Sequence, residues 1–398
     1  MSERVVLHCD LNNFFASVSL LSSPTVKDLP VAVCGEEEQR HGIVLAKNEI
    51  AKKYGVKTAE TIREAKQKCP DLVILAPDYK KYNEYSIKAR EIYERYTDLI
   101  EPFGIDECWL DVTGSRLLFG SGMDIAERIR KEIKRELGIT VSIGVSFNKV
   151  FAKLGSDMKK PDGITEISKE NFKEKVWPLP VGDLLFVGKS TAKRLNEGGI
   201  FTIGDLTLCG DSTLKRMLGK SGISLKQYAL GEDNSPVLPP TENDIPKSIG
   251  RSVTPNKDIV NREEVWKIFL ELSEDISRQL RKKGLFAGGI TVHTRTTTLT
   301  VKETSHSFSG GINSSLLLAQ KGIELFDECY KWNLPLRSVG LRAINLRDDN
   351  FAVQQDLFGE STKEQKIEII EDSIQRVKDR FGTQAIKRGR IIKKGEKK

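Results

Sequence analysis

The sequence lacks paired cysteines, clustered histidines and long apolar runs, and each absence excludes a class of protein. The six cysteines show no C-x-x-C spacing and are typical of reduced, mostly buried thiols in a cytosolic protein. The four histidines are scattered, which argues against a zinc site. No apolar run approaches membrane length and the N-terminus lacks a signal peptide, so we expect a cytoplasmic protein without a membrane partner.

Length and charge set broad limits on what the chain does. A chain of 398 residues predicts roughly two to four domains, and 38% hydrophobic with 30% charged residues suits a soluble protein with a modest core. The net charge of +7 favours a polyanionic partner such as nucleic acid. Because many soluble proteins are mildly basic, the charge alone does not identify that partner.

Two acidic clusters carry the chemistry that the sequence suggests. Asp10 follows the apolar run Val5–Leu7, and Asp106 with Glu107 lies in the aromatic and apolar segment Phe103–Asp111. Three carboxylates that meet at one place cannot all stay ionised and unpaired, and divalent cations are the usual partners. Such a carboxylate-bound cation pair catalyses phosphoryl and nucleotidyl transfer.

The adjacent carboxylates need a turn to reach one site. In an ideal strand Asp106 and Glu107 would point to opposite faces, and Gly104 supplies the freedom for a turn between two short strands. We therefore expect both at a hairpin tip that faces the end of the strand carrying Asp10. The alternative is a pair of solvated loop charges, which the aromatic and apolar neighbours disfavour.

Five segments stand out as motifs: Asp10–Val18, Gly104–Asp111, Val141–Lys149, Phe151–Lys153 and Lys159–Gly163. They resemble motifs of the Y-family, translesion DNA polymerases, and occur in the order that this family has them. The resemblance covers roughly residues 1–346.

The resemblance implies an α+β, right-hand polymerase fold. Residues 1–21 and 78–166 would form a ferredoxin-like catalytic palm, because strand, helix, hairpin, helix and strand follow one another as in a split βαβ unit. Residues 22–77 would be small fingers, with a basic helix that contains Lys47, Lys52 and Lys53. Residues 167–238 would be a helical thumb, 239–347 an α/β little finger, and 348–398 a clamp-binding tail with a basic end.

Two further segments are candidates for DNA contact. Gly188, Lys189 and Ser190 resemble a helix-hairpin-helix turn, whose amides can bind a DNA phosphate. A P-loop is excluded because Asp183 stands where its first glycine is required. Residues 289–296 alternate as in a strand, and Arg295 lies on their polar face. An ordinary solvated sheet face fits that pattern equally well, and only the resemblance favours DNA.

The tail resembles a bacterial sliding-clamp peptide. Gln354 would fill one pocket of the clamp, and Leu357 with Phe358 would anchor in a second, apolar pocket. An amphipathic stripe from Ile367 to Phe381 follows, and we expect it to dock on the protein itself.

The resemblance also implies a role for each residue of the first two motifs. The Asp10, Asp106 and Glu107 carboxylates, with the Leu11 carbonyl, would hold two Mg²⁺ ions. Phe15 would exclude the 2′-hydroxyl of a ribonucleotide. The residues expected to contact the nucleoside triphosphate are Asn13 and Phe14 through their amides, Phe15 beneath the sugar, and Lys52 and Lys160 through their ammonium groups.

Four positions depart from the pattern of the family, and one of them is Lys52, which stands in the fingers block where an Arg is common. Asn12 replaces a frequent second Asp, and Ser19 replaces a frequent Glu. Glu49 stands in the fingers block where a Tyr is common, and it would repel a triphosphate unless it turns away or pairs with Lys47 or Lys53. These changes put the nucleotide affinity in question but not the reaction class.

The function expected from the resemblance is low-fidelity DNA synthesis past damaged bases by a monomer. Its partners would be primer-template DNA, dNTPs and the sliding clamp, and no stretch of the sequence is left for a proofreading exonuclease. A nucleotidyl cyclase would share the carboxylates but would not need a helix-hairpin-helix or a clamp peptide. A catalytically impaired, clamp-tethered DNA-binding protein is the second alternative, which Glu49 keeps open.

Overall fold

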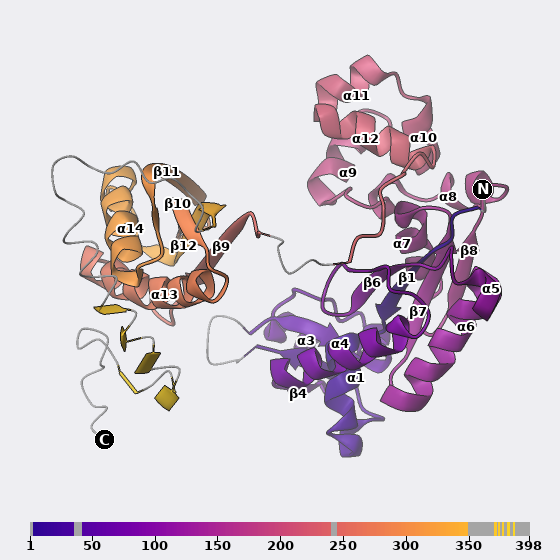
Figure 1. The fold of residues 1–398 in the computed structure, drawn as a ribbon, viewed down its shortest axis with the longest axis horizontal. Coiled ribbons are helices and arrows are strands. Elements are labelled where there is room, and N and C mark those ends of the chain that lie inside the picture. The colour runs from indigo at the N-terminus through magenta and orange to yellow at the C-terminus, as the bar shows by residue number, and fades with distance from the viewer. Residues whose placement is uncertain are drawn as a thin grey trace. The chain divides into compact units, whose positions relative to one another are not determined.

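The computed structural model describes residues 3–35, 42–239 and 245–348, and several residues between 370 and 386. The chain forms two compact units, one made of the described residues up to 239 and one of those from 245 onward (Figure 1). Within the described residues, no helix is long and apolar enough to cross a membrane.

The first unit is built on a five-stranded sheet with the order β5-β6-β1-β7-β8. Neighbouring strands are antiparallel, except β7 and β8, which are parallel. Without β8, the order and the intervening helices are those of a split βαβ unit, so the predicted α+β class is confirmed. The strands are β1 (Val6–Leu11), β5 (Ile100–Pro102), β6 (Glu107–Asp111), β7 (Val141–Ser146) and β8 (Ile164–Ile167).

Helices cover both faces of this sheet, which is why every residue of β1 is buried. Leu7, Cys9 and Leu11 join the main core on one face, whereas His8 and Asp10 alternate to the other face, toward α7. The helices of the core face are α1 (Phe14–Leu21), α4 (Tyr79–Glu94) and α6 (Gly122–Glu132), which a π-helical turn, Ile133–Leu137, extends. Helix α7 is Lys149–Met158, and the short α5 is Arg116–Phe119.

Helix α7 packs unusually close to the sheet at Gly144. A Cβ built on Gly144 would lie 1.9 Å from the Ala152 carbonyl oxygen and 2.5 Å from the Ser156 nitrogen. Both atoms belong to the α7 backbone, which cannot move without displacing the helix from the sheet. Gly144 therefore sets how closely α7, and the side chains it carries, approach β1.

We expect Gly144→Ala to destabilise the protein by several kcal/mol, about the cost of a severe overpacking substitution. Urea unfolding measures this as a lower midpoint. Gly114→Ala is the matched control, because no atom lies within 4 Å of a Cβ built there. Equal midpoints for the two variants would contradict the close packing described for α7.

A smaller sheet with its own core follows α1. Its order is β3-β2-β4, formed by β2 (Val31–Cys34), β3 (Val44–Lys47) and β4 (Val73–Leu75), with α2 (Glu49–Lys53) and α3 (Ile62–Lys68) beside it. A 3₁₀ turn, Pro24–Val26, precedes β2. The prediction that Lys47 lies on a helix was wrong. The Asn48 side chain accepts a hydrogen bond from Ala51 N and caps α2, so the helix begins after Asn48 and Lys47 stays in β3.

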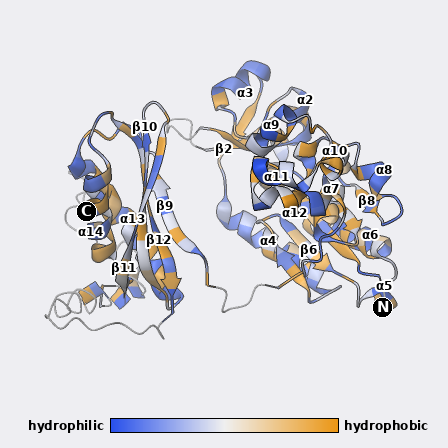
Figure 2. Cartoon of the chain, turned by 90° about the horizontal axis from the view of Figure 1, so that it is seen from above, coloured by the Kyte–Doolittle hydropathy of each residue, from blue (hydrophilic) through white to orange (hydrophobic). Residues whose placement is uncertain are grey.

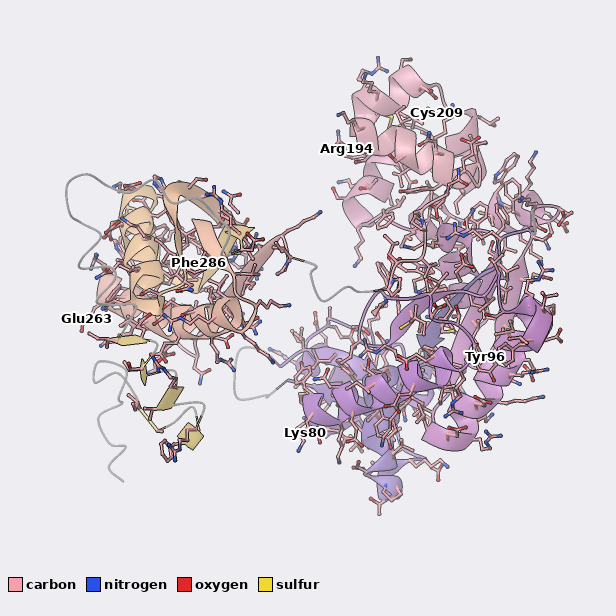
Figure 3. The ribbon with its side chains drawn as sticks, in the orientation of Figure 1. Lys80, Tyr96, Arg194, Cys209, Glu263 and Phe286 are labelled. Carbon is pink, nitrogen blue, oxygen red and sulfur yellow. The ribbon has the colours of Figure 1, made fainter. Side chains whose placement is uncertain are left out.

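A helical region completes the first unit. It contains α8 (Phe172–Val176), α9 (Lys189–Glu197), α10 (Ile203–Leu208), α11 (Asp211–Leu218), α12 (Lys220–Ala229) and a 3₁₀ turn, Val181–Asp183. Arg194 on α9 and Cys209 after α10 mark this region in Figure 3. The chain then returns to the five-stranded sheet. Asn148 Nδ2 donates to the Gly231 carbonyl over 3.1 Å, and Leu238 N donates to Glu101 over 2.9 Å.

The second unit is a four-stranded antiparallel sheet with the order β11-β10-β12-β9. Its strands are β9 (Ser248–Val253), β10 (Phe286–Thr296), β11 (Val301–Ile312) and β12 (Leu336–Arg347), and its helices are α13 (Arg262–Lys282) and α14 (Ser315–Cys329). Both helices pack on the sheet through one apolar core, and α14 carries both orange and blue residues in Figure 2, as an amphipathic helix does.

Strand β10 is more buried than its alternating sequence predicts. It lies between β11 and β12, and all six residues from 287 to 292 are buried, including Thr291 at 4% exposure. Beyond them, His293 and Arg295 are partly accessible on the same side of the strand as Thr291. The polar face predicted for DNA contact is thus accessible only toward the end of the strand.

Glu371, in the described part of the C-terminal segment, contacts the second unit. Glu371 is 7% exposed and accepts hydrogen bonds from Ser315 N (2.7 Å), Ser315 Oγ (2.7 Å) and Leu316 N (3.0 Å). Arg281 Nη2 lies 3.3 Å from the same carboxylate. A carboxylate at the N-terminus of α14 satisfies free amides and complements the helix dipole. This contact supports the expectation that the amphipathic stripe docks on the protein itself.

Candidate active site

Strand register brings the two acidic clusters together. Asp10, next to the end of β1, is the direct antiparallel partner of Glu107, the first residue of β6. The loop between β5 and β6 closes at Glu107, whose carbonyl oxygen accepts a hydrogen bond from Phe103 N over 2.9 Å. Leu11 N donates to the Asp106 carbonyl oxygen over 3.1 Å, which fixes this loop beside β1. The structure thus places Asp106 and Glu107 at a hairpin tip, next to Asp10.

The crowding of these carboxylates is visible in the pKa of Asp106. Burial raises this pKa to about 6, and the negative charges of Asp10 and Glu107 raise it further in the same direction. Asp10 is itself 6% exposed. Three acidic groups in a partly desolvated pocket favour any cation that can enter it.

Two lysines lie against the carboxylates. Lys153 Nζ is 3.2 Å from Asp10 Oδ2, 3.0 Å from Glu107 Oε1 and 3.1 Å from Asp157. Lys160 Nζ is 2.7 Å from both Asp10 and Asp157. Burial lowers the pKa of each lysine, but the neighbouring carboxylates, Asp10 foremost, outweigh it and raise both pKa values. Both side chains are therefore charged.

The same arrangement tests whether a divalent metal fits. Among the described residues, no three His, Cys, Asp or Glu side chains converge as a complete metal cage. Instead the Lys153 ammonium lies between Asp10 and Glu107, where a cation balances both charges. The donors are hard carboxylate oxygens, which suit Mg²⁺ and Mn²⁺ rather than softer metals. The residues present therefore fit a magnesium site.

Sequence reasoning missed Lys153 and His8. Lys153, Ser156, Asp157 and Lys160 recur at the spacing of one helix face, a signal that pointed to a polar stripe beside the carboxylates. His8 is 0% exposed on the same face of β1 as Asp10. Burial lowers the pKa of His8 to about 3, and the charge of Lys153 acts in the same direction, so the ring is neutral.

Asn12 makes three hydrogen bonds, and an aspartate could not make the one that the amide donates from Nδ2. Its Oδ1 accepts from Asp162 N over 2.8 Å and from Thr140 Oγ1 over 3.0 Å, and its Nδ2 donates to Ser142 Oγ over 2.9 Å. The Ser142 hydroxyl proton is already donated to the Lys159 carbonyl oxygen over 3.2 Å. The amide therefore holds the segment that carries Lys160, which explains the departure at this position without a metal contact.

The expected triphosphate residues form a second chain of contacts. Asn13 has the left-handed φ of 48° at the start of α1, and its Nδ2 donates to Glu49 Oε1 over 2.9 Å. Lys52 Nζ lies 3.5 Å from the same oxygen. The ion pair of Glu49 is therefore with Lys52, one turn along α2, and not with Lys47 or Lys53, the two partners that the sequence suggested as alternatives to its turning away. Lys47 instead donates to Thr58 Oγ1 over 3.1 Å.

Phe15 projects from the first turn of α1 and stacks on Tyr82. The two ring centroids are 4.2 Å apart with an interplanar angle of 10°, and Tyr79 meets Phe15 edge-on at 5.9 Å. Ser19 Oγ is hydrogen-bonded to Tyr82 Oη over 2.7 Å, so the departure at Ser19 fixes the ring beneath Phe15. Phe14, by contrast, is buried in the core at 2% exposure.

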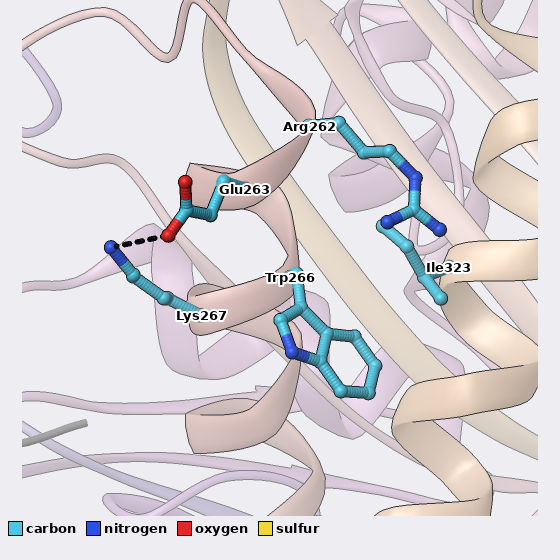
Figure 4. Close-up of a pocket in the computed structure, with 5 residues that line it drawn as sticks. All are labelled: Arg262, Glu263, Trp266, Lys267 and Ile323. Atoms are coloured by element: carbon cyan, nitrogen blue, oxygen red, sulfur yellow. Dashed lines mark ion pairs between the residues drawn. The ribbon is translucent and has the colours of Figure 1, made fainter. Parts of the chain in front are cut away.

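The remaining predicted residues lie elsewhere. Gly188 caps α9, with Lys189 and Ser190 in its first turn, and no atom lies within 4 Å of a Cβ built on Gly188. Arg295 belongs to the second unit, where its buried Nε has no hydrogen-bond partner among the described residues. Gln354, Leu357 and Phe358 lie outside the described residues. A pocket of the second unit, lined by Arg262, Glu263, Trp266, Lys267 and Ile323, contains none of the predicted catalytic side chains (Figure 4).

Comparison with known proteins shows the family to which the chain belongs. The impB/mucB/samB family matches residues 9–157, its C-terminal domain matches 246–357, and its helix-hairpin-helix motif matches 169–200. DNA polymerase IV of Acetivibrio thermocellus is 48% identical over 391 residues, which are 98% of each chain. The chain belongs to the DNA polymerase IV group of the Y-family. DNA polymerase IV 1 of Bacillus subtilis is 34% identical and covers 99% of this chain and 95% of its own.

The Y-family fold extends through both units. A solved Y-family DNA polymerase chimera matches with a TM-score of 0.77 and 26% identity, covering 87% of this chain and all of its own. The predicted polymerase fold, with an antiparallel little finger at the C-terminus, is therefore confirmed. As a member of the DNA polymerase IV group, the chain is a DNA-directed DNA polymerase of the translesion class. The reading as a nucleotidyl cyclase was wrong.

Proposed function

We propose that this polymerase adds dNMP to a primer 3′-hydroxyl at a site made of Asp10, Asp106, Glu107 and the Leu11 carbonyl. The observation that carries the proposal is the pairing of Asp10 with Glu107, with cationic nitrogens 2.7–3.2 Å from their oxygens. Two Mg²⁺ ions, when bound there, supply the charge that activates the primer hydroxyl and stabilises the leaving pyrophosphate.

The residues around the carboxylates bind and orient the nucleotide. The side chain of Lys160 is 29% exposed, and its ammonium group moves from its contact with Asp10 to a contact with the triphosphate. Lys52 is 50% exposed, and the Asn13–Glu49 contact holds the helix that carries it beside α1. The backbone N–H groups of Asn13 and Phe14 at the start of α1 donate hydrogen bonds to phosphate oxygens. Glu49 no longer opposes this, because Asn13 and Lys52 already engage its carboxylate.

We assign the five-stranded sheet, in residues 1–21 and 78–166, as the palm, residues 22–77 as the fingers and 167–238 as the thumb. The α9 N-terminus at Gly188–Ser190 binds a DNA phosphate through its free amides. The little finger, residues 239–347, contacts the DNA backbone through the accessible end of its open sheet face. Arg295 lies there, and Arg342, the strand partner of Thr291 on the same face, is paired with Glu303 over 3.1 Å.

Primer extension tests the proposal. With Mg²⁺ and dNTPs, the protein extends a primer opposite an undamaged template and past a single abasic or alkylated base, one nucleotide at a time and with frequent errors. DNA binding is measured in parallel by fluorescence anisotropy. Binding without any addition would contradict the proposal and favour the alternative, a catalytically impaired, clamp-tethered protein.

The tail segment around Gln354, Leu357 and Phe358 binds the sliding clamp in the same proposal. Two apolar side chains that enter one pocket are the kind of anchor that carries most of a peptide's affinity. We expect Leu357→Ala with Phe358→Ala to weaken clamp binding more than ~100-fold, roughly 3 kcal/mol, while primer extension without the clamp is unchanged. Equal clamp affinity of this variant and the wild type, measured by surface plasmon resonance, would exclude the segment. The enzyme acts as a cytoplasmic monomer in this proposal.

A further inference from the structure

His8 has an unusual pair of neighbours for a buried histidine. Its ring lies on the α7 side of β1, with Trp109 of β6 edge-on at 5.3 Å. Its Nδ1 is 2.8 Å from Ser156 Oγ, and its Nε2 is 3.6 Å from Glu107 Oε2. Nε2 is buried and has no hydrogen-bond partner among the described residues. The unpartnered nitrogen thus faces a carboxylate of the active site.

The proton count at Ser156 decides which nitrogen of His8 is protonated. The Ser156 hydroxyl has one proton and two acceptors in reach, His8 Nδ1 at 2.8 Å and the Lys153 carbonyl oxygen at 2.7 Å. If the proton goes to Lys153, His8 must donate from Nδ1, and the lone pair of Nε2 then faces the Glu107 carboxylate. Two acceptors would oppose each other where water cannot separate them, which is costly.

The other arrangement satisfies every group. The Ser156 hydroxyl donates to Nδ1, and the proton on Nε2 points at Glu107. The Lys153 carbonyl loses little, because it lies inside α7 and accepts the amide proton of Asp157 in the helix ladder. The distance of 3.6 Å exceeds the usual limit of about 3.2 Å by a few tenths of an ångström, which a small tilt of the carboxylate closes.

We propose that His8 is a positioning residue of the active site, which donates from Nε2 to Glu107 and aims its carboxylate for metal binding. This inference rests on the proposed metal role of Glu107. A partner that donates to a ligating carboxylate fixes its orientation, and losing such a partner costs about 10–100-fold in metal affinity. His8 itself touches neither substrate nor metal.

The packing around His8 is suited to this role. Gly144 pairs with His8 across β1 and β7, and its missing side chain lets the α7 backbone come close enough for Ser156 to reach Nδ1. The Trp109 indole is held in turn by its hydrogen bond to the Lys149 carbonyl oxygen, 2.9 Å long. The ring is therefore fixed on two sides, with Nε2 facing Glu107.

The tautomer is directly measurable. Long-range ¹H–¹⁵N correlation spectra of the full chain resolve its four histidines, and the His8 signals are those missing from His8→Gln. At pH 7 we expect a neutral ring with the proton on Nε2 and a bare Nδ1. A proton on Nδ1, or on both nitrogens, would overturn the proposal.

Metal affinity supplies the second measurement, with Mn²⁺ as the probe and the electron paramagnetic resonance of free Mn²⁺ as the readout. His8→Phe, which keeps the ring volume but has no donor, is expected to bind Mn²⁺ about 10-fold more weakly. His8→Gln places an acceptor near Ser156 and a donor near Glu107, and is expected to stay within about 3-fold of the wild type. Equal weakening of both variants would indicate a merely structural role and overturn the proposal.

Asp106→Ala separates this inference from the proposed function. If Asp106→Ala binds Mn²⁺ as the wild type does, the carboxylate site itself is wrong, whatever the tautomer of His8. If Asp106→Ala loses Mn²⁺ and His8→Phe does not, the metal site stands and the role of His8 is overturned. Should His8→Phe fail to fold, Ser156→Ala takes its place, because it removes the donor to Nδ1, and unchanged Mn²⁺ binding in that variant would likewise overturn the proposal.

Discussion

Primer extension by Asp106→Ala is expected to fall at least ~10³-fold below the wild type, which corresponds to about 4 kcal/mol of transition-state stabilisation. The proposed role of Asp106 is to hold the cations beside the reacting phosphate, and alanine offers no oxygen for this. The nucleotide and the DNA are held mainly by other residues, so DNA binding is expected to change little. The loss should therefore appear in kcat rather than in the affinity for DNA.

The same substitution is expected to leave the protein at least as stable as the wild type. The folded-state pKa of Asp106 is raised to about 6, because burial and the charges of Asp10 and Glu107 disfavour its ionised form. At pH 7 the charged Asp106 is thus destabilising relative to its unfolded state, and alanine removes that cost. A gain in thermal stability together with lost activity distinguishes a functional carboxylate from a structural one.

Asp98→Ala is the matched control for this pair of measurements. Asp98 is an exposed carboxylate on the same sheet unit, just before β5, and it takes no part in the contacts of the site. Its variant should extend primers at the wild-type rate. Residual activity of Asp106→Ala within 10-fold of that control would remove Asp106 from the metal site.

The parts of the fold that the sequence predicted well are those where local pattern and tertiary packing agree. Apolar runs next to glycine and acidic residues predicted β1, β6 and the hairpin between β5 and β6, and this hairpin lies beside β1 as expected. Strand β10 was predicted less well, because its threonines and glycines suggest a half-exposed strand. Its burial depends on its central place between β11, which follows it directly, and β12, which is distant in sequence, and a local pattern does not show that place.

The carboxylates of the site could be predicted from the sequence, but the lysines that balance their charge could not. Asp10 and Glu107 lie at the ends of predicted strands and within recognisable motifs. The position of Lys153 depends instead on how closely α7 approaches the sheet at Gly144. The partner of Glu49 was missed because Lys52 and Lys53, three and four residues further along α2, both lie on its side of the helix. The choice between two such lysines depends on side-chain rotamers, which a sequence pattern does not fix.

Phe15→Ala is expected to reduce the discrimination against ribonucleotides about 100-fold, or roughly 3 kcal/mol. The proposed role of the Phe15 ring is purely repulsive: it occupies the space that a 2′-hydroxyl would need, so its removal admits ribonucleotides while dNTP incorporation changes far less. The stack on Tyr82, with centroids 4.2 Å apart, keeps the ring from turning aside. The measurement is the ratio of kcat/KM for a dNTP to that for the matching rNTP.

Tyr82→Phe tests whether the ring stack or the Tyr82 hydroxyl keeps the Phe15 ring in place. It keeps the ring beneath Phe15 and removes only the hydrogen bond to Ser19. If the stack positions the Phe15 ring, Tyr82→Phe retains most of the discrimination against ribonucleotides. Tyr82→Ala then loses a large share of it, even though Phe15 is intact. Unchanged discrimination in Phe15→Ala would assign Phe15 to the palm core alone, beside Phe14 and Val18. Selection against the 2′-hydroxyl would then have to come from another part of the chain that is proposed to touch the nucleotide, such as the backbone at the start of α1.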